Sequence, residues 1–149
     1  MTDTFRVRPA AGAGDLAACA GIYAANQREI MPDGPPEAWS RDGFPYAVAG
    51  EDVFVALAPR GEVVGFVSLW RPDPFVHFLH VASTWRGRGV GAALLEHALA
   101  TLPAGPVDLK CLPDNRAALA FYRRLGWAEV GSDLDAEPPY VRLRLTRRP

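Results

Sequence analysis

Arg86-Gly87-Arg88-Gly89-Val90-Gly91-Ala92 is a glycine-rich turn that joins an apolar, strand-like run to an amphipathic helical run. Because glycine lacks a Cβ atom, three glycines here allow successive backbone N–H groups to converge on one point. The helix that follows adds the positive end of its dipole, and the two arginines add positive charge. A turn of this composition between a strand and a helix predicts a binding site for a pyrophosphate group.

The spacing of the glycines excludes two common phosphate-binding motifs. The dinucleotide fingerprint G-x-G-x-x-G needs a final glycine where this chain has Ala92 or Leu94. That fingerprint also follows a first strand, whereas this turn follows the fourth expected strand. A P-loop needs Gly-Lys-Ser/Thr, but Gly91 is followed by two alanines. A turn that connects strand to helix without binding a ligand stays as the alternative.

The segments on either side of the turn have clear periodicities. Residues 75–81 alternate as a strand, which predicts Phe75, His77, Leu79 and Val81 on one face and Val76, Phe78 and His80 on the other. Residues 90–102 carry apolar side chains at helical spacing and are followed by Pro103, which predicts a helix over this range.

The remaining residues predict an α/β fold in one domain over residues 1–149. Runs rich in β-branched and aromatic residues predict strands at 5–8, 53–58, 63–70, 107–111, 127–131 and 140–145. A first helix is expected with Asp15 as its N-cap, and a third after Asp114 or Asn115, with Leu125 facing inward and Gly126 ending it. The proline-rich residues 27–50 predict a loop with at most a short helix near residues 37–41. This order predicts a mixed sheet with helices on both faces.

Composition and charge restrict the class of protein. A chain of 149 residues with 49% hydrophobic and 22% charged residues fits one globular domain. Its net charge of -1 argues against a nucleic-acid binder. Two cysteines, no signal-like N-terminus and no run of about 18 apolar residues lead us to expect a cytoplasmic protein that does not enter a membrane. Residues 1–74 carry 6 basic and 10 acidic groups and residues 75–149 carry 10 and 7, which fits an anionic cofactor on the second half.

A second block, at residues 115–127, carries a resemblance to a known family. It reads Asn115-Arg116-Ala117-Ala118-Leu119-Ala120-Phe121-Tyr122-Arg123-Arg124-Leu125-Gly126-Trp127. This resembles the N-x-x-A-x-x-F-Y-x-x-x-G-F/W stretch of the GNAT superfamily of N-acetyltransferases, whose Gln/Arg-x-x-Gly-x-Gly/Ala turn is matched by Arg86, Gly89 and Gly91. The resemblance is close over residues 75–131 and looser over residues 5–70. It implies a mostly antiparallel twisted sheet of six to seven strands with a splayed cofactor slot.

The resemblance also implies where acetyl-CoA would bind. Backbone groups around Leu79 and Val81 would bond the pantetheine amides, and Asn115 and Ala118 would line the pantetheine side of the helix. The pyrophosphate would lie against the turn, whose residues are Arg86, Gly87, Arg88, Gly89, Val90, Gly91 and Ala92.

Two residues are candidates for proton transfer. In family members a tyrosine at the position of Tyr122 donates a proton to the sulfur, a role that suits a protonated phenol, although a purely packing role is the alternative. His77 is the candidate for taking the amine proton, with a structural histidine in a half-buried sheet as the alternative. His80, on the opposite face, and His97, within a helix, are weaker candidates. We expect no metal site, since no cluster of metal-ligating residues appears.

These observations predict transfer of an acetyl group from acetyl-CoA to a primary amine, directly within a ternary complex. No triad or activated cysteine is spaced for an acyl-enzyme. A CoA-binding module without catalysis is the alternative. Residues 28–52 contain six acidic residues together with Trp39 and Tyr46, which suggests a cationic acceptor with some apolar body. The acceptor can be a small molecule or a protein, and the resemblance leaves a homodimer open.

Overall fold

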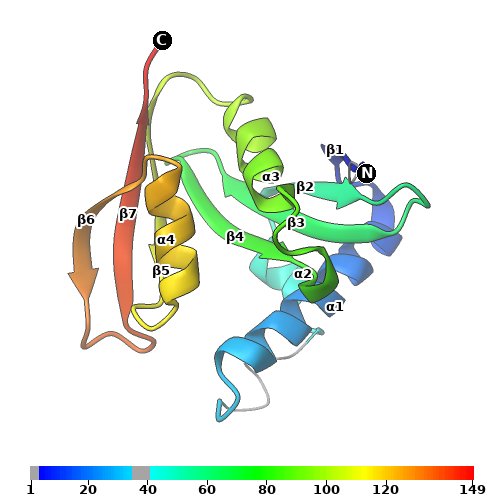
Figure 1. Cartoon of the computed structure of the whole chain (residues 1–149), viewed down its shortest axis with the longest axis horizontal. Coiled ribbons are helices and arrows are strands. Elements are labelled where there is room, and N and C mark those ends of the chain that lie inside the picture. Colours follow the sequence, from blue (N-terminus) through cyan, green and yellow to red (C-terminus); the bar gives the residue numbers. More distant parts are fainter. Residues whose placement is uncertain (1–3, 35–40) are drawn as a thin grey trace.

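A computed structural model describes residues 4–34 and 41–149 of the chain (Figure 1). The helices are α1 (Gly12–Ile30), α2 (Phe44–Ala47), the short 3-10 helix η2 (Ser83–Trp85), α3 (Val90–Leu99) and α4 (Arg116–Arg124). The strands are β1 (Arg6–Pro9), β2 (Asp52–Leu57), β3 (Val63–Trp70), β4 (Phe75–Val81), β5 (Gly105–Cys111), β6 (Ala128–Asp133) and β7 (Tyr140–Arg147). The predicted short helix near residues 37–41 lies, except for its last residue, outside the described residues.

The seven strands form one sheet in the order β1-β2-β3-β4-β5-β7-β6. Every neighbouring pair is antiparallel except β4 and β5, which are parallel. This confirms the predicted mixed, mostly antiparallel sheet of six to seven strands. No helix within residues 4–34 and 41–149 is long and apolar enough to cross a bilayer.

The sheet opens between its two parallel strands. β4 and β5 are paired only at Phe75 with Asp108 and at Val76 with Leu109, and Figure 1 shows the two strands diverging beyond that point. β5 instead stays paired along its whole length with β7. The predicted splay is therefore present, and it leaves one edge of β4 without a neighbouring strand over most of its length.

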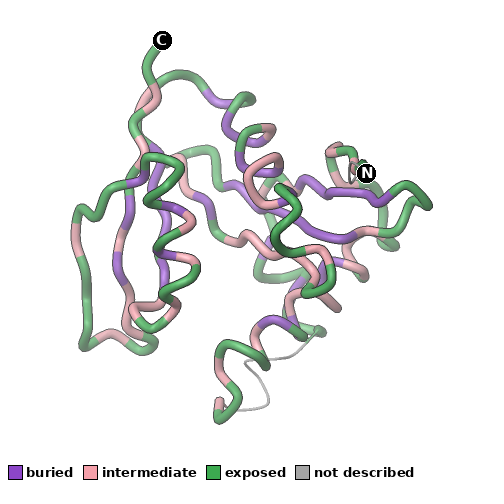
Figure 2. The backbone as a smooth tube through the Cα atoms, viewed as in Figure 1, coloured by how far each residue is buried: buried purple, intermediate pink, exposed green. Residues whose placement is uncertain are grey.

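Helices cover both faces of the sheet, as predicted. One apolar cluster lies under α3 and α4 and includes Val90, Leu94 and Tyr122; a second lies under α1 and α2 and includes Cys19 and Phe44. Figure 2 shows the buried segments concentrated on the central strands and on the inner side of α3. The two clusters fix the helices that flank the opening in the sheet.

A glycine on β3 sets how closely α3 approaches the sheet. A Cβ atom on Gly65 would lie 3.1 Å from the carbonyl oxygen of His80 and 3.1 Å from a methyl group of Val90, at the first turn of α3. Because both contacts are tighter than ordinary packing allows, any larger residue would push α3 outward. Gly65 therefore helps to hold the N-terminus of α3 beside the end of β4.

Local signals predicted some helix ends correctly and others wrongly. Asn115 caps α4 by accepting a hydrogen bond from the N–H of Ala118 at 3.2 Å, and Gly126 follows α4 with a φ of 96°, as predicted. Asp15 is not an N-cap: α1 begins three residues earlier, and the Asp15 carboxylate reaches back to the N–H of Ala11 and to Arg8. Leu125 is 40% exposed rather than inward-facing, because α4 ends at the preceding residue.

A β-bulge interrupts the predicted alternation of β4. Ser68 of β3 lies opposite Phe78 and Leu69 lies opposite Val76, so His77 is an extra residue with no partner on β3. Val76, Leu79 and Val81 consequently pack on the α3 face. The prediction that His77 shares a face with Leu79 and Val81 is wrong, because a strict period of two assumes that no residue is inserted.

Candidate active site

A cleft of about 1150 Å³ occupies the opening between β4 and β5. It extends from the last turns of α1, along β4, to the glycine turn and the N-terminus of α3. Of the residues predicted from the sequence to bind the cofactor or act in catalysis, all except Arg88 line this cleft. Residues separated by up to 45 positions in the sequence, from His77 to Tyr122, thus surround a single space.

The glycine turn has the backbone conformation that the sequence predicts. Gly87 and Gly89 have φ angles of 76° and 84°, in the region that L-residues rarely adopt, and a Cβ atom on either would meet no protein atom within 4 Å. The turn is therefore constrained in conformation and open on the side where a Cβ would point. That open space is suited to a ligand that approaches the backbone closely.

The N-terminus of α3 offers unpaired donors beside this space. Gly89 is the N-cap and provides no side-chain acceptor, and the N–H of Ala93 makes the first intrahelical bond, to the carbonyl of Gly89 at 3.1 Å. The N–H groups of Val90, Gly91 and Ala92 precede that bond and have no acceptor within the helix. Three donors and the helix dipole therefore point toward the mouth of the turn, which favours an anion.

Gly91 also has a packing role. Its Cβ would lie 3.3 Å from the ring of Phe121 on α4 and 3.7 Å from Val81 on β4. The sequence predicted this glycine as part of the phosphate cradle, and its small size in addition lets α3 and α4 approach each other across the cleft.

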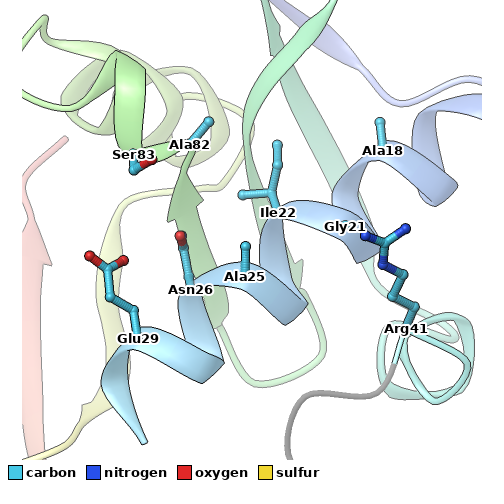
Figure 3. A pocket seen from close by; sticks show the side chains of 9 residues that line it. All are labelled: Ala18, Gly21, Ile22, Ala25, Asn26, Glu29, Arg41, Ala82 and Ser83. Atoms are coloured by element: carbon cyan, nitrogen blue, oxygen red, sulfur yellow. The ribbon is translucent and has the colours of Figure 1, made fainter. Parts of the chain in front are cut away.

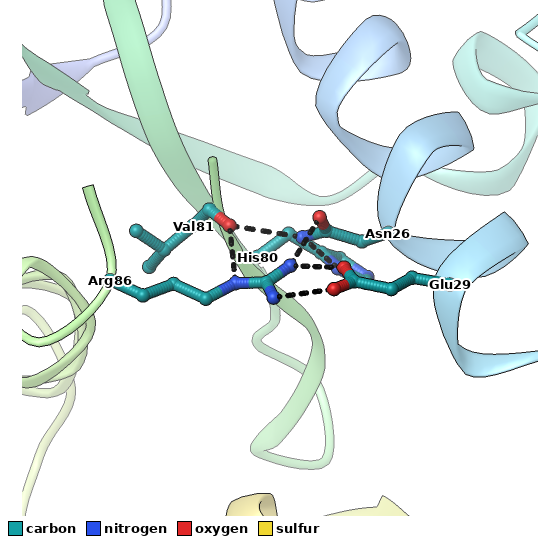
Figure 4. Close-up of polar contacts among 5 residues, drawn as sticks. All are labelled: Asn26, Glu29, His80, Val81 and Arg86. Atoms are coloured by element: carbon teal, nitrogen blue, oxygen red, sulfur yellow. Dashed lines mark hydrogen bonds and ion pairs between the residues drawn. The ribbon is translucent and has the colours of Figure 1, made fainter. Parts of the chain in front are cut away.

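The two arginine side chains of the turn contact other side chains of the protein. Figure 4 shows the guanidinium of Arg86 reaching α1, where it donates to Glu29 at 2.8 and 3.1 Å and to the side-chain oxygen of Asn26 at 2.7 Å. This pairing lowers the pKa of the Glu29 carboxyl through the hydrogen bond and charge of Arg86. The guanidinium of Arg88 lies 4.6 Å from the centre of the Trp85 ring. Arg86 is therefore bonded to α1, and the backbone N–H groups at the start of α3 are the donors beside the open space of the turn.

The open edge of β4 presents backbone groups to the cleft. The N–H of Ala82 donates to Val64 of β3 at 2.8 Å, and because backbone groups alternate along a strand, those of Val81 point toward the opening. The carbonyl of Val81 accepts from Asn26 at 3.1 Å and from Arg86 at 3.4 Å (Figure 4). Asn26 and Arg86 therefore satisfy this carbonyl and tie α1 and the glycine turn to the end of β4.

Tyr122 closes the cleft on the side of α4. It is 9% exposed, and its ring packs against Phe121 and Trp127, with centroids 5.2 and 5.8 Å apart. Burial raises the pKa of the Tyr122 hydroxyl, and the neighbouring Cys111 adds to the rise. Burial likewise raises the pKa of the Cys111 thiol to about 11. Both groups are therefore protonated at neutral pH, so Tyr122 can give a proton and Cys111 is a poor nucleophile.

The chain matches one known protein family over most of its length. Residues 14–127 match the model of the acetyltransferase (GNAT) family, which covers the cleft, the glycine turn and α4. The chain belongs to the GNAT family. The resemblance inferred from two short sequence blocks is thereby confirmed over most of the chain.

Individual relatives agree with this assignment. The chain is 35% identical over 103 residues to the N-alpha-acetyltransferase RimI of Mycobacterium tuberculosis, a match that covers 65% of this chain and 63% of the relative. It is 33% identical over 122 residues to the streptothricin acetyltransferase of Streptomyces lavendulae, covering 71% of this chain and 64% of that protein. This GNAT chain thus spans somewhat less than two thirds of each relative.

A solved structure supports the fold. The crystal structure of a "histone acetyltransferase HPA2 and related acetyltransferase" from Corynebacterium glutamicum superimposes on this GNAT chain with a TM-score of 0.76. The alignment covers 99% of this chain and 98% of the other, at 22% sequence identity.

The histidines of this GNAT chain occupy three different environments. His77 lines the cleft and forms a 2.7 Å hydrogen bond between its Nδ1 atom and Glu51. His80 lies among the aromatic rings under α1, where Asn26 donates to its Nδ1 atom at 3.1 Å, and burial lowers its pKa to about 4. His97 packs against Phe54 of β2, with ring centres 5.2 Å apart. At neutral pH His80 is uncharged and a weak base, so His77 is the better placed of the two for proton transfer.

A smaller hollow of about 420 Å³ lies along α1 and is also lined by Ala82 and Ser83, which follow β4 (Figure 3). Its floor is formed by small and apolar residues of that helix, with Glu29 near one end and Arg41 near the other. Asn26 and Glu29 line both this hollow and the cleft.

No group of three or more His, Cys, Asp or Glu side chains in the described part of this GNAT chain is placed to hold a metal ion.

Sequence reasoning missed the residues that reach the cleft from distant parts of the chain. Asn26 was given no role, and Glu29 and Glu51 were counted only among the six acids of residues 28–52. Their partners lie 26 to 60 positions away, at His77, Val81 and Arg86. No local sequence pattern identifies such pairs. The one available signal was that Asn26 and Glu29 are polar residues near the C-terminal end of a helix.

Proposed function

We propose that this protein transfers an acetyl group from acetyl-CoA to a primary amine by direct attack within a ternary complex. The observation that carries the proposal is the single cleft that joins the donors at the N-terminus of α3 to the buried hydroxyl of Tyr122. Acetyl-CoA supplies the activated acetyl group, and the residues of this chain bind, orient and move protons.

The turn and the open edge of β4 would hold the cofactor. The N–H groups of Val90, Gly91 and Ala92 would bind the pyrophosphate, in the space that the glycines leave open. The pantetheine amides would meet the backbone of Leu79 and the N–H of Val81, since the Val81 carbonyl is already bonded. Asn115 and Ala118 would line the other wall, where they bond to each other at the start of α4.

Two side chains would move protons. His77 would take a proton from the amine as its nitrogen attacks the thioester carbonyl. Tyr122 would donate its proton to the sulfur as the carbon–sulfur bond breaks, and its raised pKa keeps it protonated until that step. The unreactive state of the Cys111 thiol supports direct transfer rather than an acyl-enzyme on that residue.

The acceptor is proposed as an amine, and its class is left to experiment. One relative is named an N-alpha-acetyltransferase and another a streptothricin acetyltransferase, so their names point to different acceptors. Glu137 lines the cleft and favours a cationic acceptor. Three acids of residues 28–52 favour it less, because Glu29 is paired with Arg86, Glu51 with His77 and Asp52 with Arg71. The two cysteines are free thiols, the state that a reducing cytoplasm maintains.

The decisive experiment measures release of free CoA from acetyl-CoA over a panel of amines. The panel should contain peptides with a free α-amine, peptides with a lysine side chain, and small mono- and diamines. Acetylated product and stoichiometric thiol release are expected with at least one class. Saturable binding of acetyl-CoA with no thiol release from any amine would instead favour a CoA-binding module without catalysis.

A further inference from the structure

Glu51 reaches the cleft histidine from the loop that precedes β2. Its own N–H is fixed by a 2.9 Å hydrogen bond to the carbonyl of Val48. Its carboxylate oxygen Oε2 lies 2.7 Å from Nδ1 of His77, on the bulge of β4. The two side chains differ in accessibility: that of Glu51 is 8% exposed and that of His77 is 36% exposed. The pair therefore consists of a buried acid behind a histidine that lines the cleft.

The burial of this acid is costly and is not balanced by other bonds. The second carboxylate oxygen of Glu51, Oε1, is buried and has no hydrogen-bond partner among the described residues. A buried carboxylate normally accepts several hydrogen bonds, because removing it from water is otherwise unfavourable. A stable fold does not require an acid here, so the contact with His77 needs another explanation.

The imidazole of His77 is held in one orientation. Its ring stacks on Phe78, with centroids 3.9 Å apart and planes at 19°, and its Nδ1 atom is bonded to Glu51. A carboxylate can only accept, so Nδ1 carries the proton and the lone pair of neutral His77 lies on Nε2. The bulge makes this possible, because it removes His77 from the regular ladder of β4.

We propose that Glu51 is a positioning residue that fixes the tautomer and orientation of His77 for proton transfer. It does so by holding Nδ1–H, which leaves Nε2 to accept the amine proton, and its negative charge stabilises the imidazolium that forms. The Nδ1 proton stays between His77 and Glu51 throughout, and Nε2 returns its proton to water after the amide has left. The proposal rests on the proposed role of His77 as the base.

The test is a double-mutant cycle on the full-length protein. Glu51→Gln removes the charge and keeps the size, Glu51→Leu also removes the acceptor, and both are made with and without His77→Ala. In the parent we expect Glu51→Gln to lower kcat about tenfold and Glu51→Leu to lower it further, up to the loss caused by His77→Ala, within the 10²–10⁴-fold range of acid–base catalysis. In the His77→Ala background, neither Glu51 variant should change kcat more than about twofold.

Further measurements separate positioning from folding. The KM for acetyl-CoA of Glu51→Gln should match that of Glu62→Gln, a control at an exposed glutamate in the β2–β3 turn, and its thermal midpoint should be no lower than that of the control. If Glu51→Leu does not fold, the Gln pair completes the cycle. An unchanged kcat in His77→Ala would refute the proposed base itself. A loss in His77→Ala without one in Glu51→Gln, or equal losses from Glu51→Gln in both backgrounds, would overturn the role of Glu51.

Discussion

Replacing Gly89 by alanine tests whether the turn binds acetyl-CoA through its backbone. Gly89 is the N-cap of α3, has a φ of 84°, and leaves the position of its missing Cβ free of protein atoms within 4 Å. A methyl group there would occupy the space proposed for the pyrophosphate. Gly61, in the turn between β2 and β3, provides a matched control, because its φ is 94° and its Cβ position is equally empty. Gly61 does not line the cleft.

The two substitutions should cost similar stability and differ in binding. Placing an L-residue in the left-handed region costs roughly 1–2 kcal/mol, which corresponds to a fall of roughly 2–8 °C in Tm for a domain of this size. Both variants should show this fall. Displacing one hydrogen bond to a charged phosphate costs about 1.5–3 kcal/mol, or a 10- to 150-fold increase in Kd. Only Gly89→Ala should show that increase.

Isothermal titration calorimetry with acetyl-CoA, together with thermal melts, gives both numbers for each variant. Gly89→Trp, which fills the same space with a larger side chain, should abolish binding in a folded protein. If Gly89→Ala and Gly61→Ala bind acetyl-CoA equally well, and folded Gly89→Trp binds it too, the pyrophosphate does not lie at this turn and the proposed site is wrong.

Three further predictions concern single side chains. Tyr122→Phe should lower kcat about 10²–10⁴-fold with an unchanged Kd for acetyl-CoA, and an unchanged kcat in steady-state assays would assign the proton to another group. Glu29→Gln should lower the free energy of unfolding by less than about 1 kcal/mol, since the ion pair with Arg86 is exposed. It should leave the Kd for acetyl-CoA unaltered, and tighter binding in calorimetry would mean that the released Arg86 side chain reaches the phosphates. Asp108→Asn should lower the free energy of unfolding by about 1.5–3 kcal/mol at neutral pH, because two arginines of β7 bond to the buried carboxylate and lower its pKa. As the folded-state pKa lies below the unfolded value, that stability is present above about pH 4 and is lost at lower pH, so the gap in Tm between the two proteins should narrow in acid.

The sequence predicted those parts of the fold that depend on neighbouring residues. The Asn115 cap follows from local chemistry, because its side chain satisfies a backbone N–H of its own helix. The start of α3 and the end of α4 follow from Gly89 and Gly126, because their positive φ angles favour glycine. The turn itself could be assigned for the same reason. By contrast, Asp15 was assigned as a cap, although its carboxylate bonds to Ala11 and to Arg8 of β1.

The β4 bulge shows why the site was only partly predictable. Alternation along one strand places His77 beside Leu79, but which residues face each other also depends on the pairing with β3. The single inserted residue between Val76 and Phe78 moves the β4 residues that precede it to the opposite face of the sheet. The candidate residue was thus identified correctly as lining the cleft, while the geometric reason given for it was wrong.

The two halves of the cleft differ in how far their contacts reach along the chain. Under the proposed function, the half of the cleft that would bind the cofactor is built from residues 79–122, where strand, turn and helix follow one another, so family resemblance is close there. The acceptor half depends on contacts that span 26 residues from Glu51 to His77 and 57 residues from Glu29 to Arg86. Under the proposed function, substitutions in the loop before β2 would therefore alter the acceptor side without a contact to the glycine turn. Substitutions at Asn26 or Glu29 on α1 would also change the partners of Arg86 in that turn.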